Sequence, residues 1–402
     1  MPEHRRTATA DRRNFLKTAG AGLTGAGILL GAGRDPSAQV LDEKTALDRI
    51  ASNSYPLRSL FRSRAGGRGG GRGGAAAASA AGTGRGGPAP GAGPQGPSGQ
   101  PPPQQVPGRG MGGVTPQQMR EKYGEITMLD FPQFTKDTFP GVVHMDVWSS
   151  LFGDVSDDSM YGPRGFDPST ASGRKWLERL ASILVKTGTT IHHISNNAPT
   201  GMAGPDEAAR QAGLDVARKW LDGAAIIGAQ SMRVNSGGPS YLPSATKGPD
   251  GYPRNDEIVP YLRTCIASFK EMADYGATRG VKVTLENHWG LTANPANMRI
   301  ILDEVNHPFC EASPDYANWE HEYVLFSGLE AVAPYAHTTV HAKYWDRWTN
   351  NDVQRSTRIM MASGFKGKFA LEYESGPWDG VEGVRYLLRE VMAALTSPPP
   401  QG

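Results

Sequence analysis

Cysteine is nearly absent from this 402-residue chain, which contains only Cys265 and Cys310. Neither belongs to a CxxC pair or to a Cys/His spacing of the zinc-site kind, so the sequence excludes a zinc centre built on thiolates. Cys265 lies in the helix-like run YLRTCIASFKEM, and Cys310 lies in the strand-like run PFCEA. We interpret both as buried thiols, with a disulfide as the alternative.

An excess of one charge is also missing, because 42 Lys and Arg stand against 40 Asp and Glu, a net charge of +2. Such a balance gives no global field for nucleic acid or anionic lipid. HExxH, P-loop and Gly-x-Ser-x-Gly motifs do not occur, which removes the zincin, nucleotide-binding and serine-hydrolase classes. GAGLTG at 20–25 fits GxGxxG, but no strand precedes it, so we reject a dinucleotide site.

The first 38 residues resemble a twin-arginine (Tat) export signal. DRRNFLK at 11–17 contains an arginine pair and precedes AGAGLTGAGILLGA at 19–32, a weakly apolar stretch of small residues. This stretch is too short and too rich in glycine for a stable membrane span. Asp11 stands where Ser or Thr is usual. The resemblance implies the Tat machinery as a partner and a periplasmic or otherwise exported protein.

Glycine and proline are abundant, with 51 and 31 residues, and many of them gather in one block at 64–110. A block of RGG repeats and Gly/Pro/Ala runs cannot bury a core, so we predict a disordered insertion. RNA binding through the RGG repeats is the alternative, but a solvated linker is favoured in an exported protein. The remaining sequence is rich enough in Val, Ile, Leu and aromatics to bury a sizeable core.

Strand-like and helix-like runs alternate along that remaining sequence. The strand-like runs are 141–148, 189–195, 229–236, 282–288, 308–315, 336–343 and 367–374. The clearest helix-like runs are 171–188, 205–228, 259–280, 294–305 and 380–395. We take an eighth strand from 48–58, before the Gly/Pro block, in preference to 125–131. Eight such units predict an α/β fold, a (β/α)8 TIM barrel over 45–396 with 64–110 inserted in its first strand-to-helix loop. A doubly wound open sheet is the alternative.

Polar residues follow the apolar members of several strands, as in VKVTLENHWG at 281–290. Four successive strands end in one such residue each: Glu286, Asp315, His341 and Glu372. Because barrel chemistry lies at the carboxyl ends of the strands, we expect these side chains to meet. Three carboxylates and an imidazole suit one divalent ion such as Mn²⁺, Mg²⁺, Co²⁺ or Zn²⁺. Glu374 shares a face with Glu372, so periodicity does not separate the two.

The motifs around these residues resemble those of the xylose isomerase-like barrels, the sugar phosphate isomerase/epimerase family, in the wider group that includes endonuclease IV. They are TLENHWG, SPDYANW, VHAKYWD and FALEYESG, supported by KWLDGAAIIGAQSMRVNSGG and GVVHMDVW, and the likeness covers 48–395. Asp146 stands where the family usually has Glu, and DYAN replaces DxGN. The resemblance implies one divalent metal ion as cofactor. Its implied ligands are Glu286, Asp315, His341 and Glu372, with Glu372 preferred to Glu374.

An ion between two carboxylates suits proton transfer next to a carbonyl, with Glu286 and Glu372 as the catalytic groups. The substrate-binding candidates are His193, Arg233, His288 and Lys343. Each candidate also has an alternative role. His193 could be a packed core residue, with His192 as the candidate in its place, and Arg233 could form a structural ion pair. His288 could support a metal ligand from behind, and Lys343 could belong to a polar rim of the barrel.

The function that the sequence predicts is a metal-dependent sugar isomerase or epimerase. Its small-molecule substrate would be a carbohydrate or polyol outside the cytoplasm. Because phosphorylated sugars are mainly cytoplasmic, an exported enzyme suits a free, oxidised or glycosidically linked sugar. The alternatives are a lyase or dehydratase on a keto-sugar, a metal-dependent phosphoesterase of the endonuclease IV type, and a sugar-binding barrel without catalysis.

Overall fold

The computed structural model describes residues 40–62, 113–239 and 258–398. The predicted export signal and the predicted disordered insertion lie outside these residues. Within them, no helix is both long enough and apolar enough to cross a membrane.

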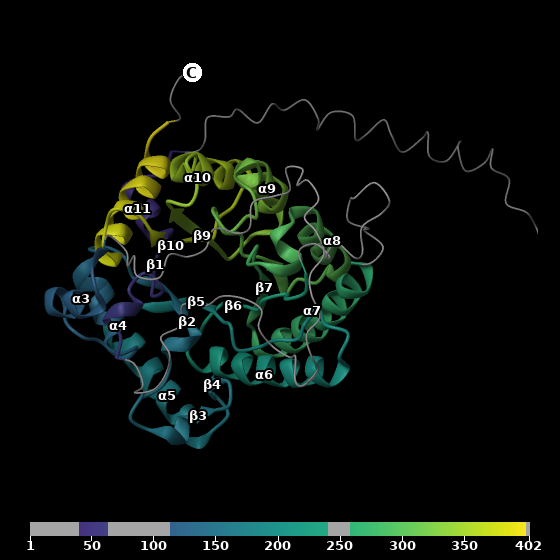
Figure 1. The fold of residues 1–402 in the computed structure, drawn as a ribbon. Coiled ribbons are helices and arrows are strands. Elements are labelled where there is room, and N and C mark those ends of the chain that lie inside the picture. Colours follow the sequence, from purple (N-terminus) through teal and green to yellow (C-terminus); the bar gives the residue numbers. More distant parts are fainter. Residues whose placement is uncertain (1–39, 63–112, 240–257, 399–402) are drawn as a thin grey trace, which may run out of the picture. The chain divides into compact units, whose positions relative to one another are not determined.

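Eight parallel strands form the barrel, and the structure confirms the predicted fold (Figure 1). In sheet order they are β8 (Cys310–Ala312), β7 (Lys282–Leu285), β6 (Ser231–Arg233), β5 (Thr190–Ser195), β2 (His144–Trp148), β1 (Ile50–Asn53), β10 (Lys368–Ser375) and β9 (Thr339–Trp345). Parallel bridges from Ala312 to Ala336 and from Asp315 to His341 join β8 to β9. Each barrel strand therefore pairs with the barrel strands that precede and follow it in the chain, and the pairing of the β8 and β9 segments closes the ring. The alternative fold, a doubly wound open sheet, is wrong.

The first barrel strand is the preferred one of the two candidates. β1 pairs with β10 through Ile50 and Phe369 and with β2 through Ala51 and His144. The rival segment contributes only an isolated bridge between Ile126 and Phe61. The Gly/Pro block thus falls between β1 and the helix α3 in chain order.

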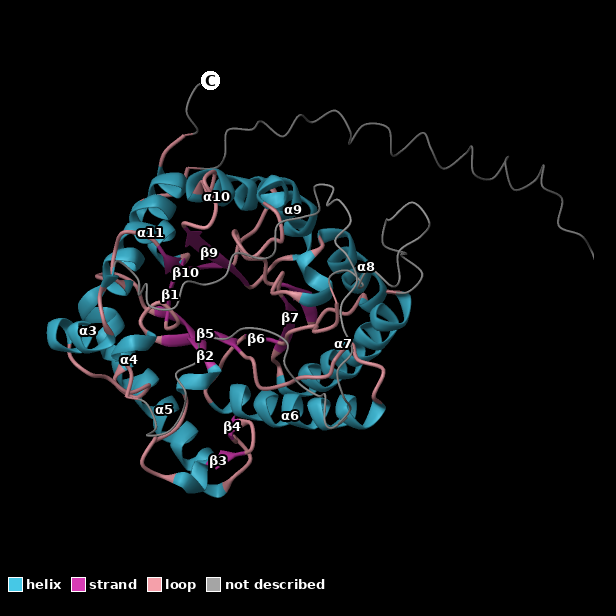
Figure 2. Ribbon diagram, viewed as in Figure 1, coloured by secondary structure: helices cyan, strands magenta, loops and turns pink. Residues whose placement is uncertain are grey.

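Helices surround the strands, as Figure 2 shows. Their bounds are α2 (Glu43–Asp48), α3 (Pro116–Tyr123), α4 (Phe131–Thr138), α5 (Ala171–Thr187), α6 (Glu207–Ile226), α7 (Val259–Arg279), α8 (Pro295–Val305), α9 (Leu325–Val332), α10 (Val353–Ala362) and α11 (Gly380–Thr396). A short hairpin of β3 (Tyr161–Gly162) and β4 (Gly165–Phe166) lies between β2 and α5 in the chain. The helix ends follow local rules: Thr170 caps the start of α5, and left-handed Gly188 and Gly280 end α5 and α7.

The apolar core lies between the strands and the helices, whereas polar residues of the strands face the barrel interior. Val283 of β7 approaches α7, and Tyr373 of β10 lies so close to α11 that only glycine fits at Gly383. The alternate residues make contacts across the ring, such as that between His341 of β9 and Asp146 of β2. Because successive side chains of a strand point to opposite faces, one strand supplies both the core and the site.

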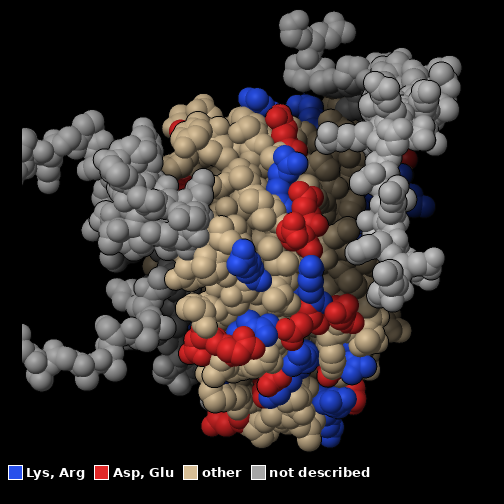
Figure 3. Space-filling model, turned by 90° about the vertical axis from the view of Figure 1, so that its right-hand side faces the viewer, with Lys and Arg blue, Asp and Glu red and all other residues tan. Residues whose placement is uncertain are grey.

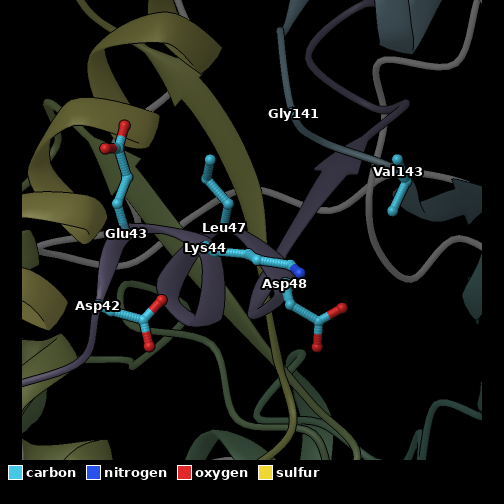
Figure 4. Close-up of a pocket in the computed structure, with 7 residues that line it drawn as sticks. All are labelled: Asp42, Glu43, Lys44, Leu47, Asp48, Gly141 and Val143. Atoms are coloured by element: carbon cyan, nitrogen blue, oxygen red, sulfur yellow. The ribbon is translucent and has the colours of Figure 1, made fainter.

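Two surface features lie apart from that interior. On the face drawn in Figure 3, Lys and Arg alternate with Asp and Glu, in keeping with the small net charge. Figure 4 shows a pocket between α2 and the segment that leads into β2, lined by Asp42, Glu43, Lys44, Leu47, Asp48, Gly141 and Val143. These residues precede β1 and β2, so the pocket belongs to the amino ends of the strands, opposite the predicted site.

Candidate metal centre

The four predicted ligand residues meet at the carboxyl ends of the strands. Atoms of Glu286, Asp315 and His341 lie within 4.8 Å of one another, and each residue is at most 1% exposed. His341 Nδ1 is 3.2 Å from Glu286 Oε2 and 4.0 Å from Glu372 Oε2. One prediction of detail is wrong: His341 and Glu372 do not end their strands, because β9 continues to Trp345 and β10 to Ser375.

Asp315 lies three residues beyond β8 and is fixed there by Asn287. The Asn287 side chain accepts from the Asp315 backbone N–H at 2.7 Å and donates to its carbonyl at 2.9 Å. Asp315 Oδ1 in turn accepts from the N–H groups of Ala317 and Asn318 at 2.7 and 3.0 Å. Among the described residues, positive φ outside glycine occurs at Trp289 and Asn306 alone. Ala317 therefore forms this turn without the glycine that the family motif has there.

Asp146 orients the imidazole of His341. Its Oδ2 lies 2.8 Å from His341 Nε2, and its Oδ1 accepts from Ser195 Oγ at 2.9 Å. Burial alone would raise the pKa of Asp146, but the nearby His193 and His341 lower it. The ionised carboxylate only accepts, so it places the proton on Nε2 and directs Nδ1 toward Glu286. Within the described part of the chain, His341 Nδ1 has no hydrogen-bond partner.

Carboxylates outnumber cations in this interior. The carboxylates are Asp146, Glu286, Asp315, Glu372 and Glu374, and the fixed cations are Arg233 and Lys343. Lys343 Nζ lies 2.9 Å from Glu372, 3.2 Å from Asp315 and 3.3 Å from Glu374. Burial raises the pKa of Asp315 to about 7 against the attraction of Lys343, with Glu372 and Glu286 adding to the rise. The negative excess calls for a further cation.

The donor set fits a divalent ion. Asp315 Oδ2 is buried and, like His341 Nδ1, has no hydrogen-bond partner among the described residues. Asp315 and His341 each bring one ligand atom within 4.8 Å of a ligand atom of Glu286. Three carboxylates and one imidazole suit the ions that accept mixed oxygen and nitrogen ligands.

A sequence model of the xylose isomerase-like TIM barrel family matches residues 159–393, more than half of the chain. This protein belongs to that family. No curated protein sequence matches this barrel.

Solved structures resemble this xylose isomerase-like barrel at low identity. The 3-keto-D-glucoside 4-epimerase YcjR from E. coli shares 14% identity over 65% of this chain and 94% of its own, with a TM-score of 0.49. A xylose isomerase-like TIM barrel protein from Mycobacterium smegmatis, in complex with magnesium, shares 16% over 67% and 91%, with a TM-score of 0.46. The probable 3-DHS dehydratase AsbF from Bacillus anthracis shares 15% over 67% and 93%, with a TM-score of 0.45.

Arg233 lies against a predicted ligand of this barrel. Its Nη1 pairs with Glu286 Oε2 at 2.5 Å, and its Nη2 donates to Asn197 at 2.5 Å. Burial alone would raise the pKa of Glu286, but Arg233 and His341 hold it well below its usual value. Arg233 thus forms a structural ion pair, which was the alternative role that the sequence allowed. Because that pair lies at the predicted site, Arg233 stays a candidate for contact with a substrate.

His193 is fully buried, and its Nδ1 lies 2.8 Å from Ser231 Oγ. Burial lowers the pKa of His193 to about 3, so the ring is neutral. Its rival His192 donates to the carbonyl of Thr338 at 2.9 Å, away from the carboxylates. These surroundings fit the alternative in which His193 is a packed core residue. Its ring lies 5.7 Å from that of His341.

The last two candidates differ in depth. Lys343, only 2% exposed, lies among the carboxylates rather than on a polar rim. His288 is partly exposed, and its ring lies 6.4 Å from that of Trp289. Burial and the charge of Arg233 lower the pKa of His288 to about 3.

Sequence reasoning missed several residues that complete the site. Asn53, at the end of β1, donates to Asp146 and Glu372 at 3.2 and 3.4 Å. Tyr55 donates to Glu374 at 3.1 Å. Ser195 ends β5 beside Asp146. The signal for Asn53 and Ser195 was present in the sequence, because each is the last residue of a barrel strand, and Tyr55 follows β1 by two residues.

Proposed function

We propose that this protein is a divalent-metal-dependent sugar isomerase or epimerase that transfers a proton at the carbon next to a carbonyl. The observation that carries the proposal is the pair of carboxylates Glu286 and Glu372. Their Oε2 atoms lie 3.2 and 4.0 Å from the same nitrogen, His341 Nδ1. Two carboxylates around one point can remove a proton and return it without leaving the site.

The residues that would hold the ion are Glu286, Asp315, His341 and Glu372. When bound, a divalent ion polarises a carbonyl oxygen and offsets the negative charge that develops on it. Glu372 Oε2 lies 4.0 Å from His341 Nδ1, whereas the contacts of Glu374 are to Lys343 and Tyr55. Glu372 is therefore the better fourth ligand.

The proton transfer falls to the protein's own carboxylates. One of Glu286 and Glu372 accepts the proton from the α carbon, and the electrons of the C–H bond move onto the carbonyl oxygen. Lys343, with its ammonium 2.9 Å from Glu372, is placed to donate a hydrogen bond to that oxygen. Return of the proton to the opposite face gives epimerisation, and return to the neighbouring carbon gives isomerisation. Loss of a β-substituent instead would make the enzyme a lyase.

A multi-ion phosphoesterase finds less support. A second possible ligand group, Asp146 with His193 and His341, lies next to the first. However, Asp146 accepts directly from His341 at 2.8 Å and from Ser195 at 2.9 Å. These hydrogen bonds give Asp146 partners within the protein for both of its oxygens.

The test is metal stoichiometry on the purified protein, followed by solvent exchange. We expect one Mn²⁺, Mg²⁺, Co²⁺ or Zn²⁺ per chain, lost in Glu286→Gln and retained in the control Glu207→Gln, whose carboxylate lies on the surface of α6. We then expect deuterium from D₂O at the α carbon of a ketose or aldose panel. Two or three ions per chain would favour the phosphoesterase, and an absence of binding would refute the proposal.

We further propose that the protein acts outside the cytoplasm after Tat export. The support is the sequence DRRNFLK followed by small apolar residues. Residues 1–38 fused to a reporter should reach the periplasm of a Tat-competent bacterium, and Arg12→Lys with Arg13→Lys should block this. Export that persists in a strain without Tat would contradict the proposal.

A further inference from the structure

Trp289, three residues after the predicted ligand Glu286, has an unusual backbone. Its φ of 60° and ψ of 178° lie in a region that only glycine enters without strain. The other described residue with positive φ outside glycine, Asn306, ends α8 in the left-handed form that asparagine tolerates. Strain of the Trp289 kind collects where a side chain must be aimed at a ligand.

The strained backbone places the Trp289 ring in an aromatic cluster with Trp345 and Arg347, which we call the aromatic corner. Trp289 is 37% exposed, although most large apolar side chains here are buried. Its ring meets that of Trp345 at 6.3 Å and nearly at a right angle. Arg347 lies 5.4 Å from the Trp289 ring and 4.7 Å from the Trp345 ring, and its Nε has no hydrogen-bond partner among the described residues. Two indole rings and a guanidinium whose Nε lacks a partner are thus placed together.

The side chain of Lys343 links the aromatic corner to the carboxylates. Lys343 Nζ lies 2.9 Å from Glu372 and 5.7 Å from the centre of the Trp345 ring. From Trp345 the aromatic surface continues outward to Trp289. A sugar unit held at Glu372 and Lys343 would therefore leave the exposed ring of Trp289 to a second group, one ring further out.

We infer that Trp289, Trp345 and Arg347 bind a second sugar ring, so that the substrate is a glycoside whose other unit lies at Glu286 and Glu372. This inference rests on the proposed function for the position of the reacting unit. The C–H face of a pyranose ring packs against an indole, and its hydroxyl oxygens accept from the guanidinium. The glycoside class follows from the chain of contacts that leads from Glu372 through Lys343 and Trp345 to the exposed indole of Trp289.

The strain supplies a selective variant, Trp289→Gly. It removes the ring and also relieves the backbone, so Tm should stay level or rise while the subsite is lost. We would measure Kd calorimetrically for D-glucose, maltose, cellobiose and phenyl β-D-glucoside. The parent protein should bind at least one disaccharide about tenfold more tightly than glucose. Trp289→Gly should lose that preference with glucose affinity unchanged, and Trp289→Phe should retain most of it.

The control Tyr335→Ala removes an aromatic ring just before β9, at the other end of that strand, and should keep the preference. The inference is overturned if the parent protein shows no disaccharide preference, if Trp289→Gly keeps it, or if only phenyl β-D-glucoside shows it. Failure of the proposed function gives a different result. In that case Glu286→Gln would leave metal content unchanged, while the dependence on Trp289 would persist.

Discussion

At the scale of single residues, the proposed binding of a metal ion by His341 should depend on Asp146. The carboxylate fixes the imidazole through its 2.8 Å contact with Nε2. Asp146→Asn keeps the shape but puts an amide where the acceptor was, so the tautomer and the ring orientation are no longer enforced. We expect divalent-metal affinity to fall about 10- to 100-fold. Competition titration against a chromogenic chelator measures this directly.

The matched control for that titration is Ser195→Ala, which removes a donor to Asp146 and a 3.4 Å contact with His341 Nε2 but leaves the 2.8 Å contact between Asp146 and His341. It should change the affinity far less. Equal affinities for Asp146→Asn and the parent protein would show that His341 is oriented by its packing alone.

Lys343 holds three carboxylates together when no ion is bound. Lys343→Met leaves Asp315, Glu372 and Glu374 without their shared cation. Because breaking a buried pair leaves uncompensated charge, we expect the metal-free protein to lose roughly 3–5 kcal/mol of unfolding free energy. Urea unfolding with and without divalent metal tests this, and metal should restore part of the loss.

Lys219→Met is the control for that unfolding experiment. Lys219 pairs with Asp167 at 3.0 Å, and its side chain is 43% exposed. Its removal should cost about 0–1 kcal/mol. A loss at Lys343 no larger than this would mean that the carboxylates rearrange or take up protons at little cost.

At the scale of elements, Asn287 extends the pairing of β7 and β8 beyond both strands. Its side chain makes the two hydrogen bonds to the Asp315 backbone that a neighbouring strand would make. We expect Asn287→Ala to lower the free energy of unfolding by about 1–3 kcal/mol and to weaken metal binding, because Asp315 loses its anchor. The partly exposed Asn235, whose side chain donates to Asn197, provides the control Asn235→Ala. Unchanged metal affinity in Asn287→Ala would contradict this role.

The same elements show how far sequence reasoning reached. The helices α5, α7 and α8 end within a residue of their expected positions, because their caps are local signals. Strands β6 and β8 are shorter than expected. The residues after them continue the alternating sequence pattern, but they do not continue the hydrogen-bonded pairing of the strand. The contacts of Asp146 and Asn53 could not be predicted, because they cross the barrel and depend on the closed ring.

At the scale of the whole molecule, the excess of negative charge inside the barrel couples stability to pH. The folded pKa of Asp315, raised by burial to about 7, lies above its ordinary value of 3.8. The pKa of His341 is also raised: burial opposes this, but Glu286 and Asp146 outweigh it. A group whose pKa is higher in the folded than in the unfolded protein stabilises the metal-free fold, and this contribution is complete at low pH. The contribution is lost as the pH rises through the pKa of the group in the folded protein.

A divalent ion bound as proposed would reverse this dependence, because it would need Asp315 and His341 without their protons. We therefore expect the rise in Tm on adding metal to grow from about pH 5 to about pH 8, as protons stop competing for the site. Calorimetric unfolding of metal-free and metal-supplied protein across that range measures it. Asp315→Asn removes one titrating ligand and should flatten the curve. A gain in Tm that is the same at every pH would mean that the ion binds away from these two residues.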